Sequence, residues 1–371
     1  MSDMKLSQPK SARLINTARV LGCLRTHDDL SKAEIARVLD LNKVSTGEIV
    51  DDLIAQGLVE ETGKMESSNG RRPTCLSIVA DSRYVLSVDI GSRYTTVALC
   101  NMLSAPLHLE RIPTVAEGKT VEEFCVDIIK SCIRVIRLVD KEKIIGAGIS
   151  VGGKISADGR TIVRCPYLPW KDIPIAEAFE QVLKMQAVAR NSTYALVDAE
   201  RYASYGTDLL ESDEPVMYVE WGNSVNMALV CGDRVFGGAN SFAHLKVSQK
   251  GLCACGQIGC LEANVSAWAL SGNNDAHLKD LWDRVGGEAL QCMANAISMT
   301  VQITGSEKVV ISGEGATITD SCLAELRRLC PGMAILRSAL GEKANIMAAA
   351  EIALDRWVYM TSMLEKMRTW L

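Results

Sequence analysis

Residues 251–262 read GLCACGQIGCLE and place three cysteines within eight residues, with glycines between them. Such a run fits three explanations: a disulfide, a bound metal ion, or thiols without a chemical role. The other cysteines of the thirteen in the chain are scattered singly, mostly within apolar stretches. Isolated cysteines in apolar surroundings are typical of small core residues. The cluster at 251–262 is therefore the part of the cysteine pattern that needs its own explanation.

Composition limits the class of protein. The chain has 371 residues, 48% of them hydrophobic, which is enough for two or three domains with their own cores. It has no uninterrupted run of about 18 apolar residues, so no membrane span is expected. The odd number of cysteines and the lack of a secretory signal favour reduced thiols and a cytoplasmic location. The net charge of −5 neither favours nor excludes a nucleic-acid partner, because a DNA-binding chain can keep its basic surface in one small domain.

Residues 1–80 predict a winged helix-turn-helix. Apolar residues recur at helical spacing, and the sequence Ser31–Glu34 has the form of a capping box that begins a second helix. A third helix ends at Gly57, and two short apolar runs follow it. The expected elements are helices at 14–24 and 31–38, a third helix that starts at 42–46 and ends at Gly57, and strands at 58–61 and 74–78. This order of elements is typical of a DNA-binding domain.

The start of the third helix is the end that normally enters the major groove, and it is rich in polar residues. Two arginines follow at the base of the loop between the strands, from which they can reach phosphates or a minor groove. The residues that we expect to contact DNA are Asn42, Lys43, Ser45, Thr46, Arg71 and Arg72. A helical adaptor that binds protein is the alternative. Residues 1–80 hold 11 basic and 11 acidic residues, and Glu48, Asp51 and Asp52 on the same helix would repel phosphates.

The remainder of the chain has an α/β pattern. Strand pairs are expected at 84–90 with 95–102 and at 216–221 with 225–230. Each pair opens a unit that continues with helices and a further buried strand, at 144–151 and 308–312. The remaining expectations are a strand and loop at 187–198, helices at 121–138 and 281–301, and a helical segment at 345–371. Two such units in tandem predict a two-lobed α/β fold with a cleft, divided into lobes 81–200 and 201–344, with 345–371 returning to the first lobe.

Three stretches of the chain resemble the ROK family of sugar-responsive repressors and sugar kinases. The first is the predicted helix-turn-helix followed by GRRPTCLSIVADSRYVLSVDIGS at 70–92. The second is CPYLPWKDIPIAEAFE at 165–180, which is similar to the family's Pro-Asn-Leu segment with a tryptophan just after it. The third is His244 followed by the pattern CxCGxxGCxE at 253–262. The resemblance implies the two-lobed actin-like ATPase and sugar-kinase fold, with an N-terminal winged helix-turn-helix.

The resemblance also implies a structural zinc ion at the cysteine cluster. In the family one histidine and three cysteines bind this ion, which here correspond to His244, Cys253, Cys255 and Cys260. Such a Cys3His set is a closed tetrahedral zinc shell. A disulfide is disfavoured by the reducing compartment, and Cys253 and Cys255 are too close in sequence to pair without strain. We therefore expect the loop 244–262 to bind Zn2+.

The two phosphate-binding loops of the family's kinases are altered in this sequence. The first loop, Asp-x-Gly-Gly-Thr in the family, reads DIGSR at 89–93, and the second, Gly-Thr-Gly-x-Gly, reads GNSVN at 222–226. Side chains thus replace glycines where the backbone must approach phosphate oxygens. We expect no kinase activity and assign no catalytic residue. An ATP-dependent sugar kinase remains the alternative.

Part of the family's sugar site is retained. The residues that match are Gly153, Asp198, His244 and Glu262, and these are the expected effector ligands. The family's sugar-binding glutamate is replaced by Ser241, and its asparagine before the aspartate by Val197. A buried sugar hydroxyl without a partner costs about 1–3 kcal/mol, so these losses favour a different ligand or weaker binding.

The sequence thus predicts a ROK-type transcriptional regulator, most simply a repressor of carbohydrate genes. The expected partners are operator DNA and a sugar or sugar derivative, whose binding changes the angle between the lobes. A homodimer or tetramer on a near-palindromic site is expected. A protein-binding scaffold that has lost both functions is the remaining alternative.

Overall fold

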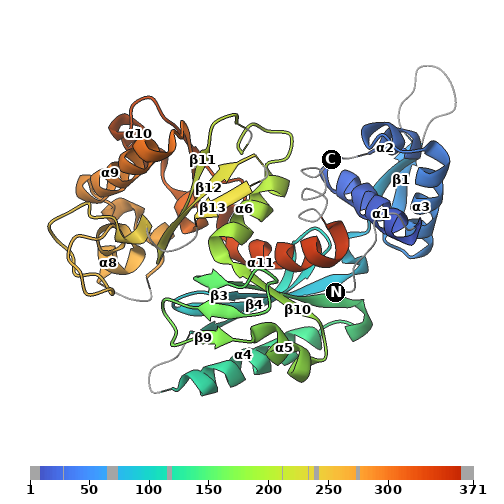
Figure 1. The fold of residues 1–371 in the computed structure, drawn as a ribbon, viewed down its shortest axis with the longest axis horizontal. Helices are drawn as coiled ribbons and strands as arrows, with labels where there is room; N and C mark the ends of the chain where they lie inside the picture. Colours follow the sequence, from blue (N-terminus) through green and yellow to red (C-terminus); the bar gives the residue numbers. More distant parts are fainter. Residues whose placement is uncertain are drawn as a thin grey trace.

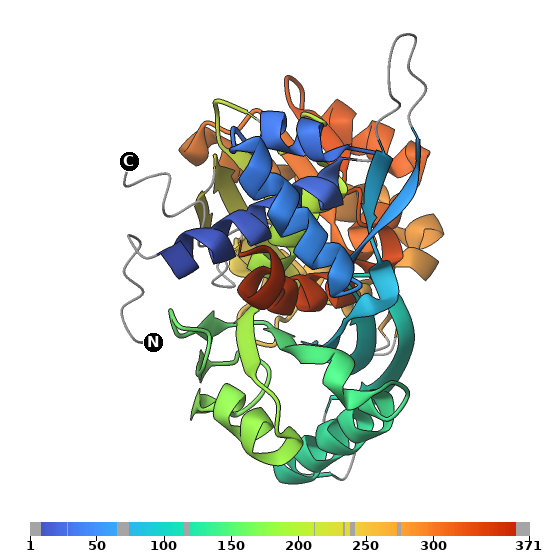
Figure 2. The ribbon, with the colours of Figure 1, turned by 90° about the vertical axis from the view of Figure 1, so that its right-hand side faces the viewer.

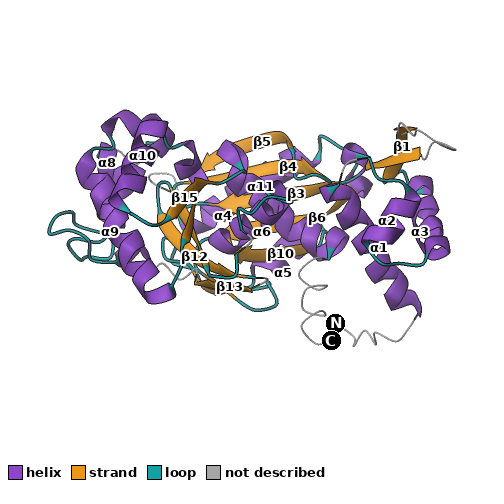
Figure 3. Cartoon of the chain, turned by 90° about the horizontal axis from the view of Figure 1, so that it is seen from above, coloured by secondary structure: helices purple, strands orange, loops and turns teal. Residues whose placement is uncertain are grey.

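The computed structural model describes residues 9–27, 29–64, 74–114, 119–210, 212–232, 234–237, 242–272 and 276–360. The chain forms three parts (Figure 1). A small helical domain and the second α/β lobe lie at opposite ends of the molecule, and the first lobe lies between them (Figure 3). None of the helices in the described ranges is long and apolar enough to cross a membrane.

The N-terminal part has the predicted winged-helix order. Its elements are α1 (Pro9–Thr26), α2 (Lys32–Val38), α3 (Lys43–Ala55), β1 (Val59–Lys64) and β2 (Thr74–Ile78). The Ser31 side chain and the Glu34 side chain form the predicted capping box at the start of α2. Leu30 pairs with Leu76 of β2, so the segment before α2 joins the small antiparallel sheet. Arg71 and Arg72 lie outside the described residues.

The first lobe is a five-stranded sheet in the order β10-β6-β3-β4-β5. Its strands are β3 (Tyr84–Ile90), β4 (Tyr94–Asn101), β5 (Pro106–Pro113), β6 (Ile144–Val151) and β10 (Ala187–Asn191). Helices α4 (Val121–Ile136) and α5 (Ile175–Leu183) pack on one face, and α11 (Ala344–Leu354) packs on the other. A separate three-stranded sheet is formed by β7 (Lys154–Ile155), β8 (Ile162–Arg164) and β9 (Lys171–Ile173).

The second lobe repeats the pattern of the first. Its sheet has the order β13-β12-β11-β14-β15, formed by β11 (Val216–Trp221), β12 (Val225–Cys231), β13 (Arg234–Gly237), β14 (Lys308–Ser312) and β15 (Ala334–Arg337). In both sheets three antiparallel strands precede two parallel ones. Its helices are α7 (Glu262–Val265), α8 (Ala267–Ser271), α9 (Gly287–Thr304) and α10 (Asp320–Leu329). The predicted two-lobed duplication is confirmed.

Three sequence-based expectations differ from the structure. The helix expected at 281–301 begins at Gly287, after two short 3-10 turns. Asp198 lies on α6 (Ser192–Ala203) rather than in a loop, because the Asn191 side chain caps a helix directly after β10. The predicted lobe boundary at residue 200 therefore falls inside a helix. Residues 361–371 of the expected C-terminal helix lie outside the described residues.

A buried ion pair joins the winged helix to the first lobe. Arg25 of α1 donates to Glu351 of α11 over 2.8 Å and to Ser104 over 3.0 Å. Its guanidinium lies 4.0 Å from the ring centroid of Tyr202 and 4.3 Å from that of Tyr359. Viewed from the winged-helix end, α11 lies between α1 and the first sheet (Figure 2). Because both charges are buried and bonded, the junction has a defined geometry.

Candidate functional site

The first turn of α3 is the exposed edge of the winged helix. Asn42 caps the helix by accepting hydrogen bonds from the backbone amides of Val44 and Ser45 at 2.9 and 3.3 Å. Lys43 and Ser45 are exposed, as predicted for DNA contacts. Thr46 differs from its prediction: it is 0% exposed, and its hydroxyl donates to the Asn42 carbonyl. Val44, which polarity-based reasoning missed, is instead 71% exposed on this turn.

The acidic residues of α3 have partners within the winged helix. Arg13 of α1 pairs with Asp52 and lies 3.8 Å from Glu48. Lys32, at the start of α2, pairs with Asp51. Exposed ion pairs of this kind contribute little to stability, but they offset the negative charge that would repel phosphates. The acidic stretch that favoured a protein-binding adaptor is thus locally neutralised.

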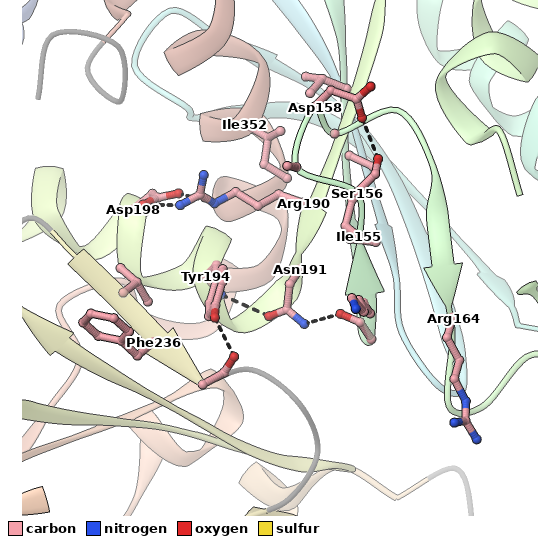
Figure 4. A pocket seen from close by; sticks show the side chains of 18 of the residues that line it. Ile155, Ser156, Asp158, Arg164, Arg190, Asn191, Tyr194, Asp198, Phe236 and Ile352 are labelled. Carbon is pink, nitrogen blue, oxygen red and sulfur yellow. Dashed lines mark hydrogen bonds and ion pairs between the residues drawn. The ribbon is translucent and has the colours of Figure 1, made fainter. Parts of the chain in front are cut away.

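A cavity of about 1510 Å³ lies between the lobes. Three of the four predicted effector residues line it: Gly153, Asp198 and His244. Gly153 has a φ of 114°, and a Cβ atom there would lie 2.2 Å from the Arg164 carbonyl oxygen, so only glycine fits. The Asn191 amide donates to the Gly153 carbonyl over 2.8 Å, which ties this turn to the start of α6 (Figure 4).

Asp198 faces Arg190 across the cavity wall (Figure 4). The Nε of Arg190 lies 2.7 Å from Oδ2 of Asp198, and its Nη2 donates to Oδ1 over 3.2 Å. Burial raises the pKa of Asp198 to about 6, although Arg190 opposes the shift. The carboxylate therefore has a cationic partner before any ligand arrives, and it is less available to a sugar hydroxyl than the sequence alone suggested.

Glu262, the fourth predicted effector residue, follows Leu261, whose amide donates to the carbonyl of Leu245 over 2.9 Å, next to His244. It is the first residue of α7, and its carboxylate accepts a hydrogen bond from the Val225 amide over 3.3 Å. It does not line the cavity that holds Gly153, Asp198 and His244. Its contact with Val225 joins the start of α7 to the start of β12, directly after the turn between β11 and β12.

The cysteine cluster converges with His244. One ligand atom from each of His244, Cys253, Cys255 and Cys260 lies within 4.8 Å of the others. The Cys255 and Cys260 sulfurs are 3.7 Å apart, and the Cys253 sulfur is 3.6 Å from Nδ1 of His244. A tetrahedral ion with Zn–S of about 2.3 Å and Zn–N of about 2.0 Å requires separations of about 3.5–3.8 Å. The donor set fits zinc in both chemistry and spacing.

Comparison with known proteins places the chain in a family. The ROK family pattern matches residues 85–352. The chain belongs to the ROK family. The MarR family pattern matches residues 14–71, which span the winged helix-turn-helix. The two matches follow one another along the chain, in agreement with the structural parts.

Similar proteins include sugar-related repressors. The ROK chain is 27% identical to a "Putative xylose repressor" of Caldicellulosiruptor sp. (strain Rt8B.4), over 85% of this chain and 87% of the relative. It is 23% identical to the "DNA-binding transcriptional dual regulator NagC" of Escherichia coli (strain K12), over 91% of each. A crystal structure of a ROK family transcriptional regulator, a homologue of the E. coli MLC protein, superimposes with a TM-score of 0.71 at 18% identity and covers 95% of this chain and 99% of that one.

Buried carboxylates lie at the segments 89–93 and 222–226 of this ROK chain. Asp89 is the penultimate residue of β3 and the first residue of the segment 89–93, and Glu220 lies on β11 before the segment 222–226. Burial raises the pKa of Asp89 to about 7 and also raises that of Glu220. Glu220 accepts hydrogen bonds from Thr193 of α6 over 2.8 Å and from Asn226 over 3.3 Å, and so links the two lobes. Sequence reasoning missed Glu220, because a carboxylate inside an apolar strand shows no motif.

A second contact joins the lobes near the first loop. Tyr94 begins β4, and its ring stacks on that of His277 with centroids 6.3 Å apart. Arg111 of β5 lies 3.2 Å from Nε2 of His277, and Nδ1 of His277 lies 2.6 Å from Glu314. Glu314 lies between Gly313 and Gly315, directly after β14. In this ROK chain its carboxylate is engaged by His277 and by the Leu278 amide.

Proposed function

We propose that this chain is a ROK-type transcriptional repressor of carbohydrate genes that binds operator DNA and responds to a sugar or sugar derivative. The observation that carries the proposal is the fusion of a winged helix at 14–71 to a ROK domain at 85–352. Relatives at 23–27% identity that share most of this length are named as repressors or regulators. A kinase has no need of the first module, whereas a sugar-responsive regulator needs both.

The DNA contacts proposed here begin at the first turn of α3. Lys43 and Ser45 are exposed there and suit phosphate and base-edge contacts, while Asn42 caps the turn. Val44 adds an apolar group that suits a thymine methyl. Arg71 and Arg72, which lie outside the described residues, stay proposed phosphate or minor-groove contacts. Binding as a dimer or tetramer would place two such turns on a near-palindromic operator.

The effector site proposed here is the cavity between the lobes. Gly153, Asp198 and His244 line it together with Asn191 and Tyr194. Zinc bound by His244, Cys253, Cys255 and Cys260 would hold the loop 244–262 as part of the cavity wall. This ion would supply structure rather than chemistry, since its four ligands leave no open coordination position.

The kinase alternative is disfavoured by the residues of the first phosphate loop and by the contact between the lobes near this loop. Ser92 and Arg93 replace small residues of the first loop, and Glu314 is engaged by His277. If ATP bound at about 100 times its dissociation constant, it would stabilise the fold by about 2.7 kcal/mol. We expect no rise in Tm with Mg-ATP and no phosphorylation of any sugar. A saturable phosphotransfer rate would contradict this part of the proposal.

The experiment that tests the regulatory function is a selection from genomic DNA fragments with the purified full-length chain at about 0.15 M salt, where nonspecific binding is weak. We expect enrichment of a near-palindromic sequence. Candidate sugars added to the bound complex should then release the DNA. If no sequence outcompetes random DNA, while the protein is folded and zinc-loaded, the scaffold alternative replaces the repressor.

A further inference from the structure

A row of cations crosses the small sheet at the edge of the cavity. Lys154 of β7 is the cross-strand partner of Arg164 of β8, and Arg164 is in turn the partner of Lys171 of β9. Direct cross-strand partners lie on the same face of a sheet, and like charges placed opposite each other destabilise the pair. Lys154 and Arg164 both line the cavity. Like charges in this arrangement lower the stability of the sheet, so their presence at the cavity edge indicates a functional role.

The row has no internal counter-charge. All three side chains are exposed, and among the described residues none of them makes a side-chain hydrogen bond or ion pair. In Figure 4, Arg164 extends without a dashed line to any neighbour, on the opposite side of the view from the paired Arg190 and Asp198. The carboxylate of Asp158, also in the wall, is occupied by the Ser156 hydroxyl and the Arg160 amide.

The charge of the cavity opposes that of the chain. Six basic side chains and three carboxylates line the cavity, whereas the whole chain has a net charge of −5. The basic residues are Lys154, Arg164, Arg190, Arg201, Arg234 and Arg356, and the acidic ones are Asp158, Asp198 and Asp355. The cavity lining therefore has an excess of positive charge, which concentrates anionic ligands.

The backbone holds the row in place. Gly153 lets the Arg164 carbonyl approach to a distance that any side chain would prevent. Asn191 fixes the Gly153 carbonyl to the start of α6. DNA is a poor occupant of this surface, because β9 lies at the bottom of the first lobe in Figure 1, far from α1–α3.

We propose that the effector is a sugar that carries an anionic group, a phosphate or a carboxylate, and that Lys154 and Arg164 bind this group at the cavity edge. Lys171 strengthens the local positive potential from the rim. The role of this sugar as an effector rests on the proposed function. Its binding at Lys154 and Arg164 does not, because that binding is measured without DNA. The carbohydrate ring then lies toward Asn191, Asp198 and His244.

The test compares matched neutral and anionic sugars on the full-length, zinc-loaded chain by isothermal titration. The pairs are glucose with glucose 6-phosphate, glucose with glucuronate, and N-acetylglucosamine with its 6-phosphate. In at least one pair we expect the anionic member to bind about tenfold more tightly or better, since charge-assisted hydrogen bonds are the stronger class. Comparing the sugar phosphates with the sugar carboxylate shows which of the two anionic groups the site binds.

The variants Arg164→Met and Lys154→Met locate the anion. Each variant should bind the anionic sugar about tenfold more weakly. Each should bind the neutral partner of that sugar with unchanged affinity. Arg164→Met should also keep or raise the Tm, because it relieves like-charge repulsion. Lys141→Met removes one exposed positive charge outside the cavity and should change neither affinity.

Three results would overturn the inference: equal or better binding of the neutral member in every pair, no saturable binding of any anionic member, or unchanged anionic affinity in both variants. If a neutral sugar releases the selected DNA and its anionic partner does not, the repressor function stands and the anionic effector is wrong. If no DNA is selected but the Arg164-dependent preference is present, the binding site stands and the repressor function fails.

Discussion

Neighbouring positions on one helical turn have opposite roles in the winged helix. Thr46 is 0% exposed and bonds to the backbone of Asn42, whereas Val44 is 71% exposed. Residue type alone would assign the DNA contact to Thr46 rather than to Val44, because only threonine has a side chain that forms hydrogen bonds. The face that a helical residue occupies depends on where the helix begins, and here the Asn42 cap sets that starting point.

Substitutions at these two positions should separate DNA reading from folding. Val44→Ala should weaken discrimination at one base pair of the selected operator with little change in Tm, because it removes an exposed apolar contact. Thr46→Ala should lower the stability by about 1 kcal/mol and leave base preference unchanged, because its hydroxyl bond is internal. Binding to a set of single-base operator variants, with Tm measured in parallel, checks both. A changed base preference in Thr46→Ala would contradict the assignment.

Burial of carboxylates makes stability depend on pH. The pKa values of Asp89 and Asp198 are raised to about 7 and about 6 by burial, above the usual value of about 3.9. The folded chain therefore holds more protons than the unfolded chain between about pH 4 and 7, and this contribution to stability falls as pH rises through that window. Asp89→Asn should thus gain Tm relative to the native chain as pH rises from 4.5 to about 7.5. A Tm difference that stays constant with pH would show that Asp89 is not responsible.

At the scale of elements, the loop 244–262 depends on glycine backbone geometry as much as on its cysteines. Gly259 has a φ of 83°, and a Cβ atom there would lie 2.0 Å from the Ser248 carbonyl oxygen. Leu252 pairs with Ile258, which folds Cys253 and Cys255 toward Cys260. The loop has little apolar core of its own, so a bound ion would provide much of its folding free energy.

Cys255→Ser should remove that ion. We expect the purified variant to lose its one zinc per chain and to unfold at a lower temperature, because binding energy at a structural metal site is folding energy. Cys231→Ser, which changes a half-buried cysteine on β12 outside the cluster, is the matched control and should keep its zinc. The measurements are the zinc content of each variant by mass spectrometry and its Tm. One zinc per chain with an unchanged Tm in Cys255→Ser would disprove the site.

At the scale of the whole molecule, the winged helix and the cavity are connected through α11 and α6. Glu351 of α11 bonds to Arg25, and the next residue, Ile352, lines the cavity. Tyr202 of α6 lies under the same guanidinium, one turn from Asp198. Two packed helices and one buried ion pair thus form a continuous connection between the cavity and α1.

Arg25→Met should test this junction. It leaves Glu351 buried without its cation, which should lower the free energy of unfolding by about 3–5 kcal/mol. The double variant Arg25→Met/Glu351→Leu should recover part of this loss, because two apolar groups replace an unpaired charge. Denaturant unfolding of the native chain, both single variants and the double variant completes the cycle. Strictly additive losses would show that the two residues are not coupled.

The local sequence determined much of this protein. The capping box at Ser31 and the alternation of strands and helices depend on residues close together in the chain, and both were predicted correctly. The spacing of His244 with three cysteines is equally local, and the four side chains converge in the fold. The winged helix and the duplicated lobes follow from the same short-range patterns. These patterns carry information because helix and strand periodicity is local.

Only the tertiary structure decided which side chains share a site. It left Glu262 out of the cavity lining, paired Asp198 with Arg190, buried Thr46, and aligned Lys154 with Arg164 and Lys171 across three short strands. It also brought Arg25 to Glu351 across 326 positions of the chain. The physical reason is that burial and charge pairing depend on which surfaces meet after folding, and residues far apart in sequence carry no local signal of that meeting.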